Sequence, residues 1–175
     1  MKKIMLISLL IMMPLLIMAQ PTDPAIIKAK KETAVIFDLG RFFGYLNTME
    51  EEAPEYALSM DQMNEIYNTL SKYLKLDRIE IDDANTTLLY LEEELLTLDQ
   101  LIYVDGLAIE KMENRVSGAG AGGGTGGNTS STGSGGGQLS GYVAGGDFNP
   151  LKDTSKTIGK DIAAFYEYIK EETGR

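Results

Sequence analysis

The sequence contains no cysteine, no histidine and no tryptophan. Without cysteine the chain cannot form a disulfide, a thiolate nucleophile or a cysteine-based zinc site, and without histidine it lacks the commonest general base and metal ligand. The 16 basic residues are outnumbered by 26 acidic residues, so we expect no nucleic-acid partner, because a phosphate backbone needs a basic surface. This composition predicts no metal, no other cofactor and no enzymatic activity.

The first 19 residues have the layout of a secretory signal peptide. Lys2 and Lys3 precede an apolar run over residues 4–18, which ends at the small residue Ala19. The run is shorter than the roughly 20 residues that span a bilayer as a helix. We predict a signal peptide over residues 1–19, a periplasmic or extracellular location, and no stable membrane span after cleavage. An uncleaved membrane anchor is the alternative.

Residues 20–117 predict an all-α domain. Asp23 before Pro24 is typical of a helix N-terminus, and apolar residues then recur at helical spacing in four predicted helices that begin near residues 24, 59, 82 and 98. The residues predicted to form their apolar faces are, helix by helix, Val35, Leu39, Phe42, Leu46 and Met49; Met63, Ile66, Tyr67, Leu70 and Leu74; Ala84, Leu88, Leu91 and Leu95; and Leu101, Ile102, Ala108, Ile109 and Met112.

A glycine-rich segment follows the predicted domain. About half of residues 118–146 are glycine and none is charged, so the segment has too little apolar surface to offset the entropy of ordering. We predict a disordered tether over residues 118–149. Its Gly118-x-Gly120-x-x-Gly123 pattern lacks the preceding strand and following helix that a dinucleotide site requires.

Residues 150–175 predict a C-terminal amphipathic helix. Ile158, Ile162, Phe165 and Ile169 recur at helical spacing and form one apolar face. A helix of this length is marginal on its own in water, so we expect this candidate docking face to pack on the chain's own helices.

Two acidic clusters invite a metal or catalytic interpretation. A calcium loop starting at Asp77 would have isoleucine at two ligand positions, so Asp82 and Asp83 are better explained as acidic residues that stabilise a helix N-terminus. The run that begins at Glu92 is predicted to face solvent. A carboxylate-dependent hydrolase is the enzymatic alternative.

The most informative pattern is a repeated pentapeptide, Leu-[Ser/Thr]-x-Asp-Gln, at residues 58–62 and 96–100. Each copy predicts a capping box, in which the hydroxyl caps a helix and the glutamine side chain bonds back to the N–H of the capping residue. The preceding leucine supplies a hydrophobic staple, and each cap should contribute about 1 kcal/mol. The predicted helix-cap residues are Leu58, Ser59, Gln62, Leu96, Thr97 and Gln100.

The two pentapeptides resemble the paired LTxxQ motifs of the Spy/CpxP family of periplasmic stress proteins. The resemblance covers about residues 58–113, and the first copy has Ser59 where the family has threonine. It implies a small exported helical domain, often a cradle-shaped dimer, that shields unfolded clients. The glycine-rich segment, the C-terminal helix and the acidic charge are not part of the family pattern. Helix capping alone is the other explanation of the repeat.

These features together predict a non-enzymatic exported module, chaperone-like or related to envelope stress. It would offer an apolar helix groove to a protein, either a client or a second copy of the chain. The alternative is a structural or assembly subunit whose tethered C-terminal helix docks on another envelope protein.

Overall fold

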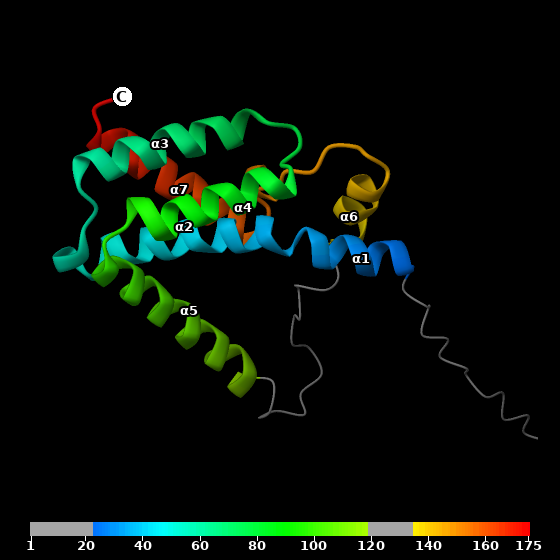
Figure 1. Cartoon of the computed structure of the whole chain (residues 1–175), viewed down its shortest axis with the longest axis horizontal. Coiled ribbons are helices and arrows are strands. Elements are labelled where there is room, and N and C mark those ends of the chain that lie inside the picture. The colour runs from blue at the N-terminus through cyan, green and yellow to red at the C-terminus, as the bar shows by residue number, and fades with distance from the viewer. Residues whose placement is uncertain (1–22, 119–134) are drawn as a thin grey trace, which may run out of the picture.

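The computed structural model describes residues 23–118 and 135–175, so the predicted signal peptide and the first part of the predicted tether lie outside it. The described residues confirm the all-α prediction, with one isolated bridge between Arg78 and Phe148 in place of a sheet (Figure 1). None of the described helices is long and apolar enough to cross a membrane. The helices are α1 (Pro24–Glu32), α2 (Ala34–Glu52), α3 (Met60–Lys75), α4 (Ile81–Tyr90), α5 (Leu98–Gly118), α6 (Gly135–Val143) and α7 (Thr157–Glu172), with short turns η1 (Pro54–Tyr56), η2 (Leu91–Leu95) and η3 (Pro150–Lys152).

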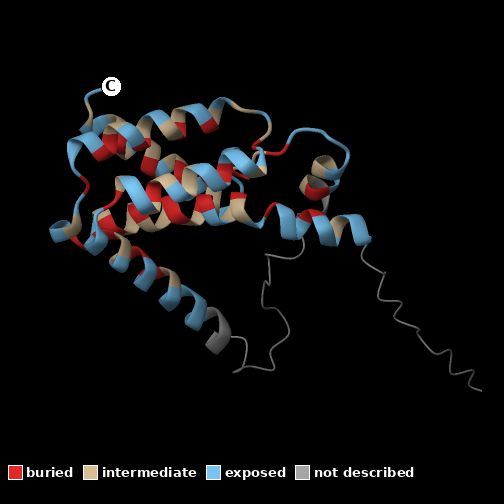
Figure 2. Cartoon of the chain, viewed as in Figure 1, coloured by how far each residue is buried: buried red, intermediate tan, exposed pale blue. Residues whose placement is uncertain are grey.

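Helix α2 is the centre of the fold and contacts α1, α4, α5 and α7. Its predicted apolar face is buried at Leu39, Phe42 and Leu46. Ile36 and Phe43, which the predicted face did not contain, are buried as well, because neighbouring helices cover more than one side of α2. Figure 2 shows the buried residues gathered along α2 and on the facing sides of α3, α4 and α7.

The single helix predicted between residue 24 and about residue 50 is divided at Thr33. The Thr33 side chain is fully buried, and its hydroxyl donates a hydrogen bond to the carbonyl of Ala29 at 2.8 Å. A threonine hydroxyl that bonds the carbonyl four residues back often bends a helix. Beyond this division, α1 packs against α6.

The prediction of a disordered tether over residues 118–149 is wrong for its last part. Residues 135–143 form α6, and Leu139 on this helix is only 8% exposed. Phe148 is 1% exposed and exchanges two backbone hydrogen bonds with the segment that follows α3. The glycine content of the segment disfavours order, but Leu139 and Phe148 each bury their side chain in the core and hold this part of the segment in place.

The segment between α6 and α7 is also fastened to the end of α3 by polar contacts. The side-chain amide of Asn149 donates to the carbonyls of Tyr73 and Leu76, both at 2.8 Å. The Arg78 guanidinium lies 4.3 Å from the centroid of the Tyr142 ring. These contacts connect residues that are more than sixty positions apart in the sequence.

Helix α7 packs into the core against α2 and α3. Ile162, Phe165 and Ile169 are fully buried, whereas Ile158 is partly exposed. A Cβ atom on Gly40 of α2 would lie 2.6 Å from the Ile158 side chain, so the close approach of α7 requires glycine there. The predicted docking face therefore lies against the chain's own helices.

Candidate binding surface along helix α5

The two repeated pentapeptides form the N-termini of α3 and α5. In the first, the Gln62 N–H donates to the Ser59 hydroxyl at 3.3 Å, and the Ser59 N–H donates to the Gln62 side chain at 2.8 Å. In the second, Gln100 and Thr97 make the same two bonds at 3.3 and 2.9 Å. Each capping box satisfies two backbone N–H groups that the helix cannot satisfy itself.

The two glutamines also bind each other, a contact that the sequence analysis missed. The Gln62 amide donates to Gln100 Oε1 at 2.8 Å, and the Gln100 amide donates to Gln62 Oε1 at 3.3 Å. The Gln62 amide also donates to the carbonyl of Leu95 at 2.8 Å. The Gln100 amide makes the equivalent bond to the carbonyl of Ala57 at 3.2 Å. In each case the carbonyl belongs to the residue two positions before the other motif's cap.

This Gln62–Gln100 pair attaches the start of α5 to the start of α3. Both glutamines are at most 9% exposed, and the staple residues Leu58 and Leu96 are also buried. Because buried amides need all their partners, the two helix starts depend on each other. The signal that would have revealed the contact is the shared glutamine at the same position of both repeats.

Beyond its first turns, α5 diverges from the other helices (Figure 1). The side that faces the protein carries Val104 and Leu107, which are buried, and Tyr103, whose ring centroid lies 5.1 Å from that of Tyr56 in η1. Figure 2 shows that most of the remaining α5 surface is exposed. The helix is therefore fixed at its N-terminal end and covered on one side only.

The apolar face predicted for α5 is wrong at three of its five residues. Ile102, Ile109 and Met112 are 59%, 58% and 66% exposed, and Leu98 beside them is 71% exposed. Ile102 and Val104 point to opposite sides because two residues advance a helix by about 200°. Helix α5 thus has apolar residues on two opposite sides, and helical spacing alone does not choose between them. We call the exposed set the α5 stripe: Leu98, Ile102, Ile109 and Met112.

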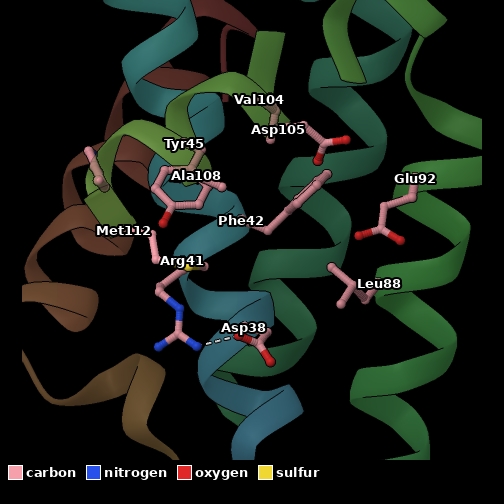
Figure 3. Close-up of a pocket in the computed structure, with 11 residues that line it drawn as sticks. Asp38, Arg41, Phe42, Tyr45, Leu88, Glu92, Val104, Asp105, Ala108 and Met112 are labelled. Carbon is pink, nitrogen blue, oxygen red and sulfur yellow. Dashed lines mark hydrogen bonds and ion pairs between the residues drawn. The ribbon is translucent and has the colours of Figure 1, made fainter. Parts of the chain in front are cut away.

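A groove of about 300 Å³ lies between α5, α4 with its η2 turn, and α2 (Figure 3). Its apolar lining is formed by Phe42, Leu88, Val104, Ala108 and Met112. Met112 belongs to both the groove and the α5 stripe, so the two apolar surfaces are continuous.

The two cations that line the groove already have partners. Arg41 forms an ion pair with Asp38, one turn earlier on α2 (Figure 3). The Lys111 ammonium lies 5.1 Å from the centroid of the Tyr45 ring, a cation–π contact.

Glu92 and Asp105 lie on opposite walls of the groove (Figure 3). Burial raises the pKa of the Glu92 carboxyl, and the negative charges of Asp105 and Glu93 raise it further. Neither wall residue forms an ion pair within the described part of the chain. The sequence predicted a solvent-facing run, but Glu92 is partly buried because the π-helical turn η2 directs it toward α5, while Glu93 is exposed.

The other acidic cluster has the structural role that the sequence predicted for two of its members. Asp82 and Asp83 lie in the first turn of α4, where they stabilise the helix N-terminus. Asp77 pairs with Lys152 at 3.2 Å. Within residues 23–118 and 135–175, no group of three or more acidic side chains is arranged to hold a metal ion.

The candidate site is therefore the α5 stripe together with the groove beside it. Comparison with family models, with curated proteins and with solved structures gives no match to this chain. The site combines an apolar surface, acidic side chains beside it, and a helix attached mainly at its N-terminal end.

Proposed function

We propose that the protein is an exported, non-enzymatic helical module that binds an apolar segment of another protein along α5, in the manner of a chaperone. The observation that carries this proposal is the α5 stripe, whose four large apolar side chains are each more than half exposed. Large exposed apolar side chains that gather on one side of a helix indicate an interaction site. The groove beside the stripe provides room for apolar side chains of the bound segment.

Two further features support the exported and chaperone-like parts of the proposal. The signal-peptide layout of residues 1–19 supports export. The resemblance of the two pentapeptides to the Spy/CpxP motifs supports a role in shielding unfolded proteins outside the cytoplasm. The net charge of −10 favours solubility and disfavours binding to anionic lipid headgroups.

The alternative proposal, an assembly subunit that docks through its C-terminal helix, loses its main support. That proposal needs the apolar face of α7 to be available to another protein. Phe165 and Ile169 are fully buried among the chain's own helices, so docking elsewhere would require α7 to leave the core.

An aggregation assay with reduced, denatured lysozyme tests the proposed function. The purified protein should suppress light scattering at a near-stoichiometric ratio. The double variant Ile102→Gln, Ile109→Gln should lose this protection because it removes the centre of the stripe. Ile27→Gln is the matched control, since Ile27 is 46% exposed on α1, away from α5. Circular dichroism confirms that each variant is folded.

Two outcomes would contradict the proposal. If the double variant protects lysozyme as well as the natural chain does, the α5 stripe is not the binding surface. If the natural chain gives no protection and instead self-associates in sedimentation experiments, the assembly function replaces the chaperone-like one.

A further inference from the structure

We infer that the segment bound along α5 is a cationic amphipathic helix, which lies on the α5 stripe and crosses α5 at Gly106. The inference rests on the proposed function, because it specifies the partner of the same surface. It is carried by the charges around the stripe, by the groove carboxylates, which form no ion pair among the described residues, and by the position of one glycine.

Acidic residues accompany the α5 stripe along the helix, and none of them is ion-paired within the described residues. Among the described side chains of α5 the one cation is Lys111, which lies over the Tyr45 ring on the side opposite the stripe. A partner with lysine or arginine on both sides of its own apolar face matches this pattern of charge. The exposed acidic residues of α5, none of which is ion-paired within the described residues, are Asp99, Asp105, Glu110 and Glu113.

The groove adds a second acidic feature next to the stripe. Glu92 and Asp105 lie on its opposite walls, and the nearby cations Arg41 and Lys111 are engaged by Asp38 and Tyr45. A basic side chain from the partner that enters the groove would lie between two carboxylates and against apolar walls. The aliphatic stem of lysine or arginine suits those walls, while the charged end suits the carboxylates.

Gly106 lies in the middle of the exposed side of α5, between Ile102 and Ile109. Glycine inside a helix weakens it relative to alanine. A Cβ atom at this position would meet no atom within 4 Å, so nothing within the described chain requires glycine. A second helix that crosses here gains from the missing side chain, because its backbone can approach α5 closely.

Charge argues against the other occupants of the stripe. Two copies of the chain packed through α5 would bring the carboxylates of one stripe against those of the other, and like charges across an interface are unfavourable. An anionic membrane surface would be repelled for the same reason. A cationic helix gains from both the apolar residues and the acidic residues around them.

Three fluorescein-labelled helical peptides with the same leucine pattern test the inference. One carries lysine beside the leucine face, one carries glutamine and one carries glutamate. The lysine peptide should bind roughly tenfold more tightly than the glutamine peptide at low ionic strength, because several exposed charge pairs form. Added salt should weaken binding of the lysine peptide and leave the affinity of the glutamine peptide unchanged. The glutamate peptide should bind more weakly than both.

Variants separate the contribution of charge from that of apolar contact. The double variant Asp105→Asn, Glu110→Gln should lower the affinity for the lysine peptide several-fold and leave the affinity for the glutamine peptide unchanged. Asp61→Asn with Glu65→Gln is the matched control, because it removes the same charge from the exposed side of α3. Gly106→Gln should weaken binding of the lysine and glutamine peptides alike, and it should raise the melting temperature of the protein. Damage to the fold would lower the melting temperature, so it would not produce this combination.

The outcomes distinguish this inference from the proposed function. If the lysine and glutamine peptides bind equally and neither acidic variant matters, the partner is not cationic, although binding along α5 stands. If Gly106→Gln leaves binding unchanged, the crossing point is wrong. If no peptide binds and the chain dimerises in a way that Ile102→Gln abolishes, the occupant is a second copy and the inference fails. If no peptide binds, no dimer forms and lysozyme is not protected, the proposed function fails too.

Discussion

Helices α7 and α5 both carry apolar side chains at helical spacing, but those of α7 are buried and several of those of α5 are exposed. On α7, Ile162, Phe165 and Ile169 are fully buried. On α5, Ile102 and Ile109 are 59% and 58% exposed, although they too follow the helical pattern. The difference shows that an apolar stripe gives a helix a surface that favours burial. The stripe does not determine which other element, if any, covers that surface.

The two helices differ in how they are attached. Helix α7 is held by specific side-chain contacts in addition to its buried apolar face. The Tyr168 hydroxyl donates a hydrogen bond to Glu50 of α2 at 3.0 Å, and the Tyr166 ring stacks on Tyr67 of α3 with centroids 5.1 Å apart. Helix α5 is fixed mainly at its start, by the Gln62–Gln100 pair. A helix fixed at one end keeps a surface free for binding.

The largest expected difference between the two helices is in core stability. Phe165→Ala should lower the free energy of unfolding by about 3–5 kcal/mol, because it leaves a cavity in the core. Ile102→Ala should change it by less than about 0.5 kcal/mol, because that side chain is mostly in water already. Urea denaturation measures both values. Equal losses would mean that α5 is packed in solution as tightly as α7.

The attachment of α5 gives the next largest effect. Gln100→Ala should cost about 3 kcal/mol, because it removes half of a capping box and takes one hydrogen-bond partner from the buried Gln62 amide, which keeps only its bond to the Leu95 carbonyl. In a double-mutant cycle with Gln62→Ala, the two losses should be non-additive by about 1 kcal/mol or more. Ser59→Ala and Thr97→Ala are the matched controls, each costing about 1 kcal/mol and adding almost independently. Additive losses for the glutamines would contradict their mutual contact.

Two glycines sharpen the comparison, since one faces α7 and the other lies on α5. Gly40→Ala should destabilise the protein by about 1–3 kcal/mol, because the new methyl group would overlap the Ile158 side chain. Gly106→Ala should stabilise it by about 0.5–1 kcal/mol, because the site is open and alanine favours the helix. Thermal denaturation measures both changes: the melting temperature should fall for Gly40→Ala and rise for Gly106→Ala. A loss of stability at Gly106 would show that α5 is covered on that side.

The smallest expected effect concerns the groove beside α5. The pKa of Glu92 is raised in the folded state, so the folded chain holds that proton more tightly, and stability is lost as the pH rises through the pKa. Glu92→Gln should therefore raise stability at neutral pH by a few tenths of a kcal/mol, because solvent screens a partly exposed group.

The pH dependence of this gain provides its check. The difference between the natural chain and Glu92→Gln should vanish at acidic pH, where the natural carboxyl is protonated in both states. Denaturation curves across this range measure it, with Glu94→Gln as the exposed control on the same turn. A gain that persists at acidic pH would assign the effect to packing instead of charge.

Much of the fold followed from local sequence features, and much of the site did not. The capping boxes at Ser59 and Thr97 were predictable because the bonds join residues three positions apart. The Gln62–Gln100 contact was not, since it joins residues 38 positions apart. The exposure of Ile102 was missed because both sides of α5 satisfy the same helical spacing.

The sequence by itself determined the all-α class, the starts of α3 and α5 and the amphipathic character of α7, because these depend on hydrogen bonds and side-chain spacing within a few residues. Only the tertiary structure decided that α7 enters the core, that Leu139 and Phe148 give the glycine-rich region a folded end, and that the α5 stripe stays in water. Burial is a property of neighbours distant in sequence. The physical reason is that the free energy of an apolar side chain depends on which surface covers it, and no local pattern specifies that surface.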